Sequence, residues 1–539
     1  MKHVFALLLL PLLLVGCSKQ AEPKPTISLT EVETSIAPTH CGSEDPTQII
    51  EVNGTGLGLF DFDNDNDLDL FVVNASDNPC RFYENVSTDA IAFNDVTIRV
   101  GLDVRRWANG IAIGDVNGDG FDDVYITCHG PNVLLLNKKG RAFEDITASA
   151  GVGDTGWGTS ARFGDLDGDG DLDLYLCNYL EFDAKKPPQR AKYKGQNVLG
   201  GPHGLKPEHD IAYENVGDGL FINATEKWGF SQEPAFSLNA VILDFTGDGL
   251  QDVFVGNDSM ANHLFVNTGE TPTRFENRGA QFGVAANGDG SMQATMGIAI
   301  ADVNGNERPD VFTTNFSSDT NTLHTNDKSG YFDDRTQRFG LGIASRTLLG
   351  WTCGFHDFDL DGDEDLYIVN GHVYPEATLE TMDSPREQPV LLYERVGDRF
   401  VLRPQENTYR DRSAVFGDLD IDGDVDVIVA ERNGAIRVLQ NNADIAEPVF
   451  VNVQGAEGNP KALGAYVRYT FEDGTTSMRW LTDGSGFQSS SVPQQFVVPS
   501  GRVITQIQVI WPNGDQDTHL FTETPSSELF TIKQGQVSP

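Results

Sequence analysis

The sequence predicts an all-β protein, a seven-bladed β-propeller followed by a small C-terminal β-domain. An acidic nonapeptide, first found at Asp61 to Asp69, occurs seven times, and successive copies start 54, 50, 79, 58, 55 and 61 residues apart. Short apolar stretches flank each copy, and they lack the 3.6-residue period that a helical solenoid requires. Four short strands in each repeat of about 50–60 residues are typical of propeller blades.

Each repeat shows the same succession of predicted strands. One apolar stretch precedes the acidic motif, as at residues 110–114, and a second follows it, as at residues 69–74. The third predicted strand ends in Asn, for example Asn137, and the fourth carries an aromatic residue, for example Phe143. Repetition of this unit predicts one blade for each copy of the motif.

The last repeat lacks its fourth strand. After Asp426 we expect strands near residues 427–429 and 436–439, and a polar break follows at 441–444. Residues 27–34 form a separate strand candidate near the N-terminus. Because a closed propeller has no open sheet edge, we expect this segment to complete the last blade.

The repeats and their flanks define the expected domains. We expect a signal segment at 1–17, a linker with the ring-closing strand at 18–44, the propeller at 45–442 and a different β-domain at 443–539. The 79-residue interval between the third and fourth motifs predicts an insertion near 182–210.

The chain is strongly acidic. Its 539 residues include 80 acidic and 38 basic ones, which gives a formal net charge of −42. A nucleic-acid-binding protein needs a basic surface to neutralise phosphates, so this class of protein is excluded. The seven motifs hold 31 of the 80 acidic residues. Carboxylates crowded in this way repel one another unless protons or cations compensate them, so the motifs predict cation binding.

The spacing within the motif fits a hard divalent cation such as calcium. Positions 1, 3 and 5 place oxygen donors on one tight loop, and Gly at position 6 allows the sharp turn. An EF-hand would require Glu at position 12, but that position is apolar here, as Val72 and Ile126 show. EF-hands are therefore excluded, and the carboxylate at position 9, for example Asp69, must close the site.

The motifs resemble those of FG-GAP/VCBS repeats, the blades of integrin-α-type propellers. In that family the side chains at positions 1, 3, 5 and 9 and the backbone carbonyl at position 7 bind calcium. The resemblance implies about five to seven Ca²⁺ ions. The strong sites are Asp61/Asp63/Asp65/Asp69, Asp115/Asn117/Asp119/Asp123, Asp165/Asp167/Asp169/Asp173, Asp357/Asp359/Asp361/Asp365 and Asp418/Asp420/Asp422/Asp426, and a weaker one is Asp244/Thr246/Asp248/Asp252. The copy Asp302/Asn304/Asn306/Asp310 has Glu307 in place of Gly, so whether it binds an ion is left open.

A different β pattern begins near Pro448. Residues 463–471, 484–489 and 509–514 resemble the ASPIC/UnbV module. FG-GAP repeats followed by this module are similar to the cartilage acidic protein family and its bacterial relatives, a resemblance that covers nearly the whole chain. It implies adhesion, or association with matrix or glycans, rather than catalysis. His519 has no catalytic partner in the sequence pattern and is expected at the surface.

The N-terminus is typical of an export signal. A basic start precedes the apolar run Val4 to Val15, which is too short for a stop-transfer helix. Leu14 to Cys17 resembles the lipobox of bacterial lipoproteins, which implies a lipid on Cys17, although an ordinary signal with a chance Cys is the alternative. Ser18 at the next position favours the outer membrane, with the face left open. We expect the membrane to be reached through this anchor.

Five further cysteines follow the signal segment: Cys41, Cys80, Cys128, Cys177 and Cys353. An odd number leaves at least one free thiol in an oxidising compartment, and Cys41–Cys80 and Cys128–Cys177 are possible pairs. The chain has no CxxC, which argues against a thiolate zinc site.

Two groups of residues are candidates for ligand contact. The insertion is basic, with Lys185, Lys186, Arg190, Lys192, Lys194 and Lys206. These side chains either contact an acidic glycan or lipopolysaccharide phosphate, or pair with neighbouring acids. Trp107, Trp157 and Trp351 precede their motifs by eight, eight and six residues, so they share one face of the innermost strands. They either stack a sugar at the channel mouth or pack between blades.

Two functions compete. The first is a non-enzymatic, calcium-binding scaffold or recognition protein of the cell envelope, with a glycan or protein ligand. The alternative is a calcium-dependent enzyme that resembles polysaccharide lyases. A lyase needs a base near the channel mouth, and His129, His356, His372 and the insertion supply candidates. Nothing in the sequence shows that these candidates converge.

Overall fold

The computed structural model describes residues 27–535 apart from 89, 232–233, 444–448, 485, 492–494, 499–502 and 522–529. The predicted signal segment, including Cys17, lies outside the described residues. Strands are the main regular secondary structure of the described chain, which also has four-residue helices α1 (Thr147–Ala150), α2 (Gly279–Phe282) and α3 (Leu379–Met382) and two short 3-10 turns at Ile49–Glu51 and Ile343–Ser345. None of the helices in this part of the chain is long and apolar enough to cross a membrane.

Seven sheets follow one another, each built on four antiparallel strands, and that of blade 1 has a fifth strand from the C-terminal domain. This confirms the predicted all-β propeller; we number the sheets blades 1 to 7 in the order of their acidic motifs. Blade 1 holds β2 (Leu57–Phe60), β3 (Asp69–Val72), β4 (Arg81–Asn85) and β5 (Phe93–Asp95), and blade 2 holds β6 (Ala108–Gly114), β7 (Asp123–Cys128), β8 (Val133–Asn137) and β9 (Phe143–Asp145). Blade 3 holds β10 (Gly158–Gly164), β11 (Asp173–Asn178), β14 (Ile211–Asn215) and β15 (Phe221–Asn223), and blade 4 holds β16 (Ser237–Leu243), β17 (Asp252–Asn257), β18 (His263–Asn267) and β19 (Phe275–Asn277).

The last three blades follow the same order. Blade 5 holds β20 (Ile298–Ala301), β21 (Asp310–Thr313), β22 (Thr322–Asn326) and β23 (Phe332–Asp334). Blade 6 holds β24 (Gly350–His356), β25 (Asp365–Asn370), β27 (Leu391–Val396) and β28 (Arg399–Arg403), beside which the short strands β26 (Gln388–Pro389) and β29 (Thr408–Tyr409) pair. Blade 7 holds β30 (Asp411–Gly417), β31 (Asp426–Glu431), β32 (Ile436–Asn441) and β1 (Leu29–Val32).

The N-terminal strand β1 is the outer strand of blade 7. It runs antiparallel to β32, with Leu29 opposite Asn441 and Val32 opposite Val438. The innermost strand of blade 7 in turn contacts the innermost strand of blade 1. The two ends of the propeller sequence thus lie in one blade, and this pairing covers an edge that would otherwise be open.

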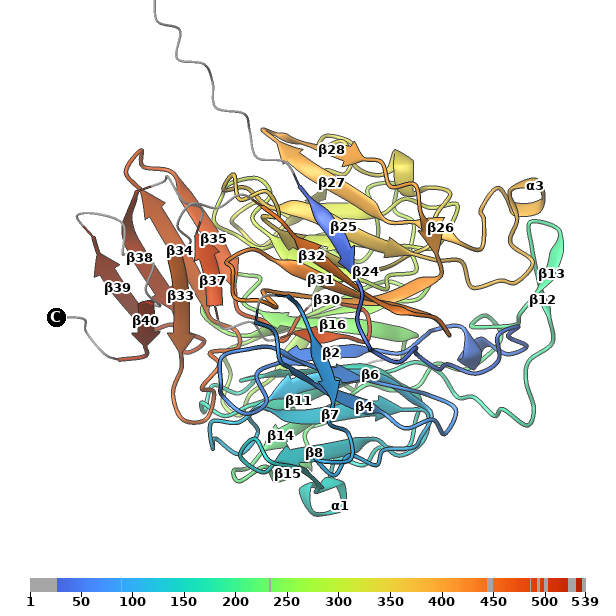
Figure 1. Cartoon of the computed structure of the whole chain (residues 1–539), viewed down its shortest axis with the longest axis horizontal. Helices are drawn as coiled ribbons and strands as arrows, with labels where there is room; N and C mark the ends of the chain where they lie inside the picture. The colour runs from blue at the N-terminus through green and yellow to red at the C-terminus, as the bar shows by residue number, and fades with distance from the viewer. Residues whose placement is uncertain are drawn as a thin grey trace, which may run out of the picture.

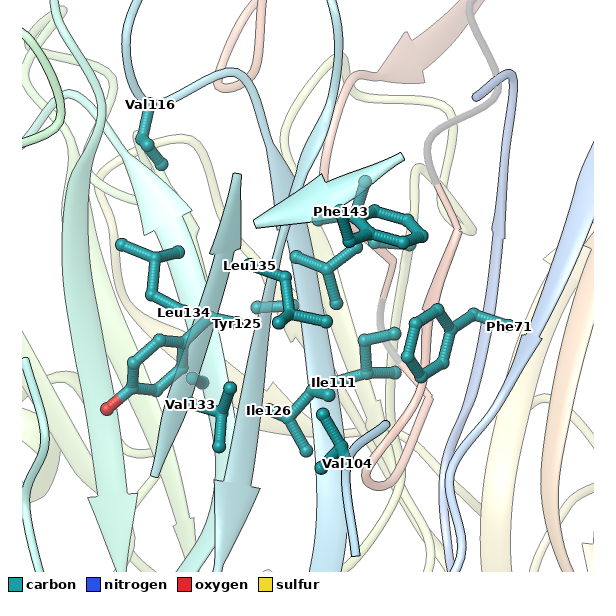
Figure 2. Close-up of a cluster of buried hydrophobic side chains, with 14 of the residues drawn as sticks. Phe71, Val104, Ile111, Val116, Tyr125, Ile126, Val133, Leu134, Leu135 and Phe143 are labelled. Atoms are coloured by element: carbon teal, nitrogen blue, oxygen red, sulfur yellow. The ribbon is translucent and has the colours of Figure 1, made fainter. Parts of the chain in front are cut away.

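Apolar side chains fill the space between neighbouring blades. Figure 2 shows one such cluster, in which Ile111, Ile126 and Leu135 from blade 2 lie beside Phe71 from blade 1. The aromatic residue of the fourth strand belongs to this core, since the Phe143 ring lies edge-on to Phe71, with the ring centroids 6.1 Å apart. The period-two pattern of the sequence therefore directs alternate side chains into these inter-blade layers.

The C-terminal β-domain stands at one end of the molecule, at the left in Figure 1. One of its sheets contains β33 (Val449–Gln454), β37 (Gln495–Val498) and β40 (Phe530–Lys533), and the other contains β34 (Tyr466–Phe471), β35 (Thr476–Trp480), β38 (Ile504–Ile510) and β39 (Gln516–Leu520). The remaining strand, β36 (Ser490–Ser491), leaves the domain and pairs in parallel with β2, the innermost strand of blade 1. This part of the C-terminal domain therefore enters the centre of the ring.

The insertion lies at the other end of the molecule. It carries the hairpin of β12 (Ala191–Tyr193) and β13 (Gln196–Val198), which projects beside α3 at the right in Figure 1. An apolar contact among Val198, Ala377 and Met382 joins the two segments. The insertion is therefore packed against the loop of blade 6.

All five cysteines of the described chain are buried and unpaired. The possible pairs Cys41–Cys80 and Cys128–Cys177 are not formed. Burial raises the pKa of the Cys80 thiol to about 12, so this side chain behaves as a small apolar group.

Candidate metal centres and the two ends of the propeller

Each acidic motif forms the loop that joins the first and second strands of its blade. In four blades, three carboxylates offer oxygens that lie within 4.8 Å of one another. These groups are Asp61/Asp63/Asp65, Asp165/Asp167/Asp173, Asp357/Asp359/Asp361 and Asp418/Asp420/Asp426. They lie in blades 1, 3, 6 and 7, where the motif has Asp at positions 1, 3, 5 and 9. Blades 2, 4 and 5 form no such group among the described residues, and in these blades Asn117, Thr246, Asn304 and Asn306 replace carboxylates.

The carboxylates at position 5 differ in whether they join these groups. Asp119, Asp169 and Asp248, predicted as ligands in blades 2, 3 and 4, belong to none of the four groups. One oxygen of each accepts the backbone N–H of position 7 in its own loop, at 3.2 Å for Asp119, 3.1 Å for Asp169 and 3.0 Å for Asp248. Asp65 and Asp361, which belong to the grouped oxygens, accept the same N–H at 3.1 and 3.3 Å. This bond therefore closes the turn of the loop without preventing the carboxylate from joining the cluster of oxygens.

Three position-5 or position-9 carboxylates of the other strong copies also stand outside the grouped oxygens: Asp69, Asp365 and Asp422. Carboxylates outside the four groups still contribute negative charge to their loops, as those of blade 2 show. Burial, followed by the charges of Asp122 and Asp119, raises the pKa of Asp115 to about 6. The structure thus brings together three of the four predicted side chains in each strong copy except that of blade 2.

The loops bend around the first carboxylate. In blade 3, Asp165 Oδ1 accepts the N–H of Gly168 at 2.8 Å, and its Oδ2 accepts the N–H of Gly170 at 3.2 Å. Gly170 has a φ of +98°, a left-handed conformation that explains the Gly at position 6. The backbone thus holds the first carboxylate on the inside of the turn.

The electrostatics of these loops favour a bound cation. Burial, together with the charges of neighbouring carboxylates, raises the pKa of Asp165 to about 6, of Asp418 to about 7 and of Asp426 to about 8. Asp357 and Asp420 each have a buried Oδ1 atom without a hydrogen-bond partner among the described residues. Unpaired, mutually repelling oxygens in a partly buried loop are the donor set that a divalent cation requires, so these residues fit calcium.

The Asp at position 9 also connects its loop to the sheet. In blade 2, Asp123 accepts the N–H of Val116 at 3.0 Å and the N–H of Asn137 at 2.7 Å. The Asn137 side chain then donates to the carbonyl of Phe62 in blade 1, at 2.9 Å. The same bond to the preceding blade is made by Asn85, Asn215, Asn267, Asn326 and Asn441, and by Arg395 in blade 6. The Asn that ends the third strand therefore links each acidic loop to the next loop around the ring.

The C-terminal domain covers the end of the propeller that carries the acidic loops, which we call the acidic end. Lys461 of this domain lies 3.5 Å from Asp122, and both side chains are buried. Gly118, with a φ of +69°, leaves room for the backbone of Glu457, whose carbonyl oxygen would be 2.8 Å from an added Cβ. Arg479 lies 3.3 Å from Glu364. The acidic residues in these contacts are at position 8 of their motifs, which the resemblance does not assign to the ion.

The blade 5 loop contacts the same domain. Glu307 stands at position 6 with a φ of +67°, where the strong copies other than blade 1 have Gly. Its carboxylate accepts hydrogen bonds from Arg468 at 2.8 Å and from Thr476 at 3.2 Å. The departure of this copy from the motif thus coincides with a contact to the C-terminal domain.

A loop of the C-terminal domain occupies the central channel. Arg162, on the innermost strand of blade 3, is fully buried and donates to the carbonyls of Gly486 at 2.8 Å and Ser489 at 3.0 Å. It also lies 3.6 Å from Asp483. Further along the loop, the Phe487 ring lies 5.0 Å from the indole of Trp351. We call residues 482–484 and 486–491 the channel loop.

The opposite end of the propeller, which we call the insertion end, contains a cavity of about 530 Å³. The innermost strands begin at this end, and their residues Leu238 and Trp351 line the cavity. Tyr193 of the insertion and Tyr374 after β25 form another part of the wall, with their ring centroids 5.6 Å apart. Asp258, after β17, supplies a carboxylate. The sequence did not single out Asp258 or Tyr374, because they follow second strands of different blades and share no motif.

The three tryptophans gather near the insertion end with different exposures. Trp157 and Trp351 are 1% and 3% exposed, and Trp107 is half-buried. Trp157 packs against Tyr179 and Phe182, with centroid distances of 5.2 and 5.3 Å. Only Trp351 of the three lines the described cavity. Trp157 is therefore buried by packing against residues that follow the second strand of its own blade.

Several basic residues of the insertion contact acids and carbonyls within the chain. Arg190 pairs with Glu376, and Lys206 lies 3.5 Å from Glu181. The ammonium group of Lys194 donates to the carbonyl of Met382 at 2.6 Å. These contacts match the alternative in which the basic side chains pair with neighbouring groups.

The histidines named as base candidates lie in separate environments. His129 shares a hydrogen bond of 3.0 Å with the carbonyl of Phe182, and His356 packs against Phe416 with the ring centroids 4.5 Å apart. Burial, together with the positive charges of Arg412 and Lys194, lowers the pKa of His372 to about 3. The expectation that His519 lies at the surface is wrong: it is 6% exposed, because its ring packs edge-on against Phe530 at 5.6 Å.

Comparison with known proteins agrees with this architecture. The FG-GAP-like repeat family matches residues 61–126, 115–176, 244–313 and 302–368, and the ASPIC and UnbV family matches residues 455–539. Cartilage acidic protein 1 of Xenopus tropicalis is 24% identical over 362 residues, which are 64% of this chain and 52% of that protein. The human protein of the same name is 25% identical over 283 residues, 49% of this chain and 39% of that protein. The chain thus spans about half the length, or less, of these curated relatives.

Similar solved structures include an Agrocybe aegerita lectin that recognises terminal N-acetylglucosamine, with 14% identity, a TM-score of 0.35 and coverage of 70% of this chain and 88% of the lectin. A Bacillus licheniformis rhamnogalacturonan lyase has 12% identity, a TM-score of 0.37 and coverage of 76% and 75%. At these scores neither likeness carries an argument about function.

From its repeats and its C-terminal domain, the chain is an FG-GAP-repeat protein with an ASPIC/UnbV domain, similar to cartilage acidic protein 1.

Proposed function

We propose that the protein is a calcium-binding scaffold of the cell envelope that recognises a glycan or protein ligand. The observation that carries the proposal is the recurrence of grouped carboxylates in four blades, two of which also hold a buried oxygen without a partner among the described residues, at Asp357 and Asp420. The family names also favour a binding protein over an enzyme. No contact among the described residues favours the alternative of a polysaccharide lyase, since His129, His356 and His372 do not converge on one site.

In each of blades 1, 3, 6 and 7, the three grouped carboxylates would together hold one ion. Calcium would supply the charge that these crowded carboxylates lack, and no catalytic role follows from it. Each loop joins two strands and is linked through a side chain to the preceding blade, as Asn137 illustrates. Ion binding therefore stabilises the ring itself.

Calcium removal tests this proposal. A ligand that binds only the folded state adds about 2.7 kcal/mol at a hundredfold excess over its Kd, so several sites together should raise the melting temperature by many degrees. We expect chelation to lower the melting temperature, and calcium to restore it better than magnesium, which keeps its waters. Identical melting curves with and without chelator, in dialysed protein that binds no calcium, would refute the proposal.

The double variant Asp165→Asn/Asp167→Asn isolates the site of blade 3, because both residues belong to its group. It should remove one ion from the calcium stoichiometry measured by calorimetry and leave the others unchanged. The matched control is Asp218→Asn, a carboxylate-to-amide change at an exposed turn outside the motifs, which should retain every ion.

The location of the protein is part of the same proposal. A lipid on Cys17 would anchor the chain to the bacterial outer membrane, with the propeller beyond the linker. Metabolic labelling with palmitate tests this, since the label should be lost in Cys17→Ala; equal labelling of both chains would contradict it.

A further inference from the structure

We propose that the cavity at the insertion end is a binding site for a neutral sugar residue, which places the ligand of the proposed recognition function at the end away from the acidic loops. This inference rests on the proposed function, which it makes specific. It is carried by four features of the wall: its aromatic surface, its carboxylate, an amide without a partner, and the balance of charge around it.

The aromatic surface is continuous across three segments. Tyr193, Phe316 and Tyr374 lie with ring centroids 5.6–5.9 Å from one another, and all three line the cavity. They are half-buried, so part of each ring is accessible. The insertion, blade 5 and blade 6 each supply one ring. Aromatic surfaces of this kind suit the C–H-rich side of a sugar ring, which is apolar in the middle and polar at its edge.

The carboxylate of Asp258 is held in place by hydroxyl groups. Tyr179 donates to its Oδ2 at 2.6 Å, and Ser259 donates to its Oδ1 at 2.9 Å. A carboxylate has about four lone-pair positions, so acceptor capacity is left after these two bonds. Sugar hydroxyls donate readily to such an oxygen. Asp258 is thus an oriented acceptor at the wall of a cavity of about 530 Å³, which is large enough for a sugar residue.

The amide of Asn53 supplies a donor without a partner. Its side chain is 6% exposed and lines the cavity, and its Nδ2 atom is buried without a hydrogen bond among the described residues. A buried donor without an acceptor costs free energy, so its position against the cavity indicates that an acceptor enters from there. One sugar hydroxyl can accept from Asn53, and another can donate to Asp258.

The charges around the cavity favour a neutral ligand. Asp258 and Asp319 line it together with His203. The aromatic walls already have cations beside them, because the Arg412 guanidinium lies 4.4 Å from the Trp351 ring and the Lys194 ammonium lies 5.6 Å from the Tyr193 ring. A cationic ligand would meet these groups, and an anionic one would meet the carboxylates. A neutral polyhydroxylated ring is repelled by neither the cations nor the carboxylates.

Calorimetric titration of the full chain in calcium tests the site. The probes are the methyl glycosides of glucose, galactose, mannose and xylose, with methyl glucuronoside and methylamine as the anionic and cationic comparisons. We expect at least one neutral glycoside to bind, and more tightly than either charged probe. If none of the four binds at millimolar concentrations, or if a charged probe binds more tightly than all of them, the proposal is wrong.

Two variants separate binding from folding. Asn53→Leu removes an amide that makes no internal bond through Nδ2, so it should weaken sugar binding at least tenfold without lowering the melting temperature. Asp258→Asn should also weaken binding at least tenfold, and Asp218→Asn is the matched control with unchanged affinity. A lower melting temperature with unchanged affinity in Asn53→Leu would assign the amide to the structure and overturn its role. Calcium binding without sugar binding would refute this inference alone and leave the calcium proposal standing.

Discussion

The buried pair of Arg162 and Asp483 offers a quantitative test of how the C-terminal domain is attached. Arg162 is 0% exposed and Asp483 4% exposed, and the two charged groups lie 3.6 Å apart in the centre of the ring. The change Arg162→Met removes the cation and leaves the carboxyl group buried. Removing one partner of a buried pair costs about 3–5 kcal/mol, so we expect a loss of this size in the free energy of unfolding.

The structure also predicts that the two residues are coupled. Burial raises the pKa of Asp483 to about 7, against the opposing effect of Arg162, so loss of the guanidinium should raise it further. The second change Asp483→Asn removes the uncompensated charge. The double variant should therefore recover about 1–2 kcal/mol, while the hydrogen bonds from Arg162 to Gly486 and Ser489 stay lost.

Urea unfolding followed by tryptophan fluorescence measures these free energies, and limited proteolysis shows whether the channel loop has become accessible. Arg141→Met is the matched control, because Arg141 is exposed and should change stability by less than about 0.5 kcal/mol. The reasoning is refuted if Arg162→Met costs less than about 1 kcal/mol. It is refuted equally if the two changes are additive with no recovery.

Two further predictions concern the ring and its pH dependence. Asn137→Ala removes the side-chain bond to the Phe62 carbonyl and should cost about 1–3 kcal/mol by thermal or urea unfolding, whereas Asn94→Ala on an exposed strand should be nearly neutral; equal effects would contradict the inter-blade role. His372 has its pKa lowered to about 3 in the folded state, so the unfolded chain binds more protons below pH 6.5 and stability falls as the pH falls. At pH 5 this amounts to about 2 kcal/mol, and His372→Asn should flatten that part of the stability–pH curve; an unchanged slope would show that His372 is not responsible.

The sequence predicts the repeating parts of the structure because repetition averages out local ambiguity. Seven copies of one acidic loop, each between apolar stretches, define the blades and the first two strands of each. The Asn at the end of the third strand was visible in the sequence, but its bond to the preceding blade was not, as with Asn137 and Phe62. A bond between blades requires knowledge of which loops are neighbours in space.

The ligand sets show the same limit within a single loop. Spacing places Asp119, Asp169 and Asp248 on their acidic loops, but it does not determine which way each carboxylate turns. All three bond to the backbone at position 7 and lie outside the grouped oxygens, whereas Asp65 makes the same bond and belongs to a group. That all three bind an ion therefore stays a prediction, because the spacing of a motif does not specify the direction of each carboxylate.

The parts that the sequence did not predict come from single, unrepeated segments. Asn53 precedes the first blade, Tyr193 lies in the insertion and Asp258 follows a second strand, so no spacing relates them before the ring closes. The position of the channel loop was equally unpredictable, since its partner Arg162 is more than 300 residues earlier in the chain. Among these contacts, only that of Glu307 could have been suspected from the sequence, because this residue departs from the motif where it contacts the C-terminal domain.

The two ends of the propeller therefore have different access to ligands. Innermost strands such as β24 begin beside Trp351 at the cavity and end beside Asp357 in an acidic loop, a span of roughly 20 Å at about 3.3 Å per residue. The C-terminal domain contacts loops at the acidic end and its channel loop enters the ring, whereas the cavity of about 530 Å³ lies at the insertion end. On the proposed function, calcium would act on recognition through the rigidity of the ring rather than by direct contact. Loss of one ion should then weaken ligand binding only to the extent that it loosens the blade that held the ion.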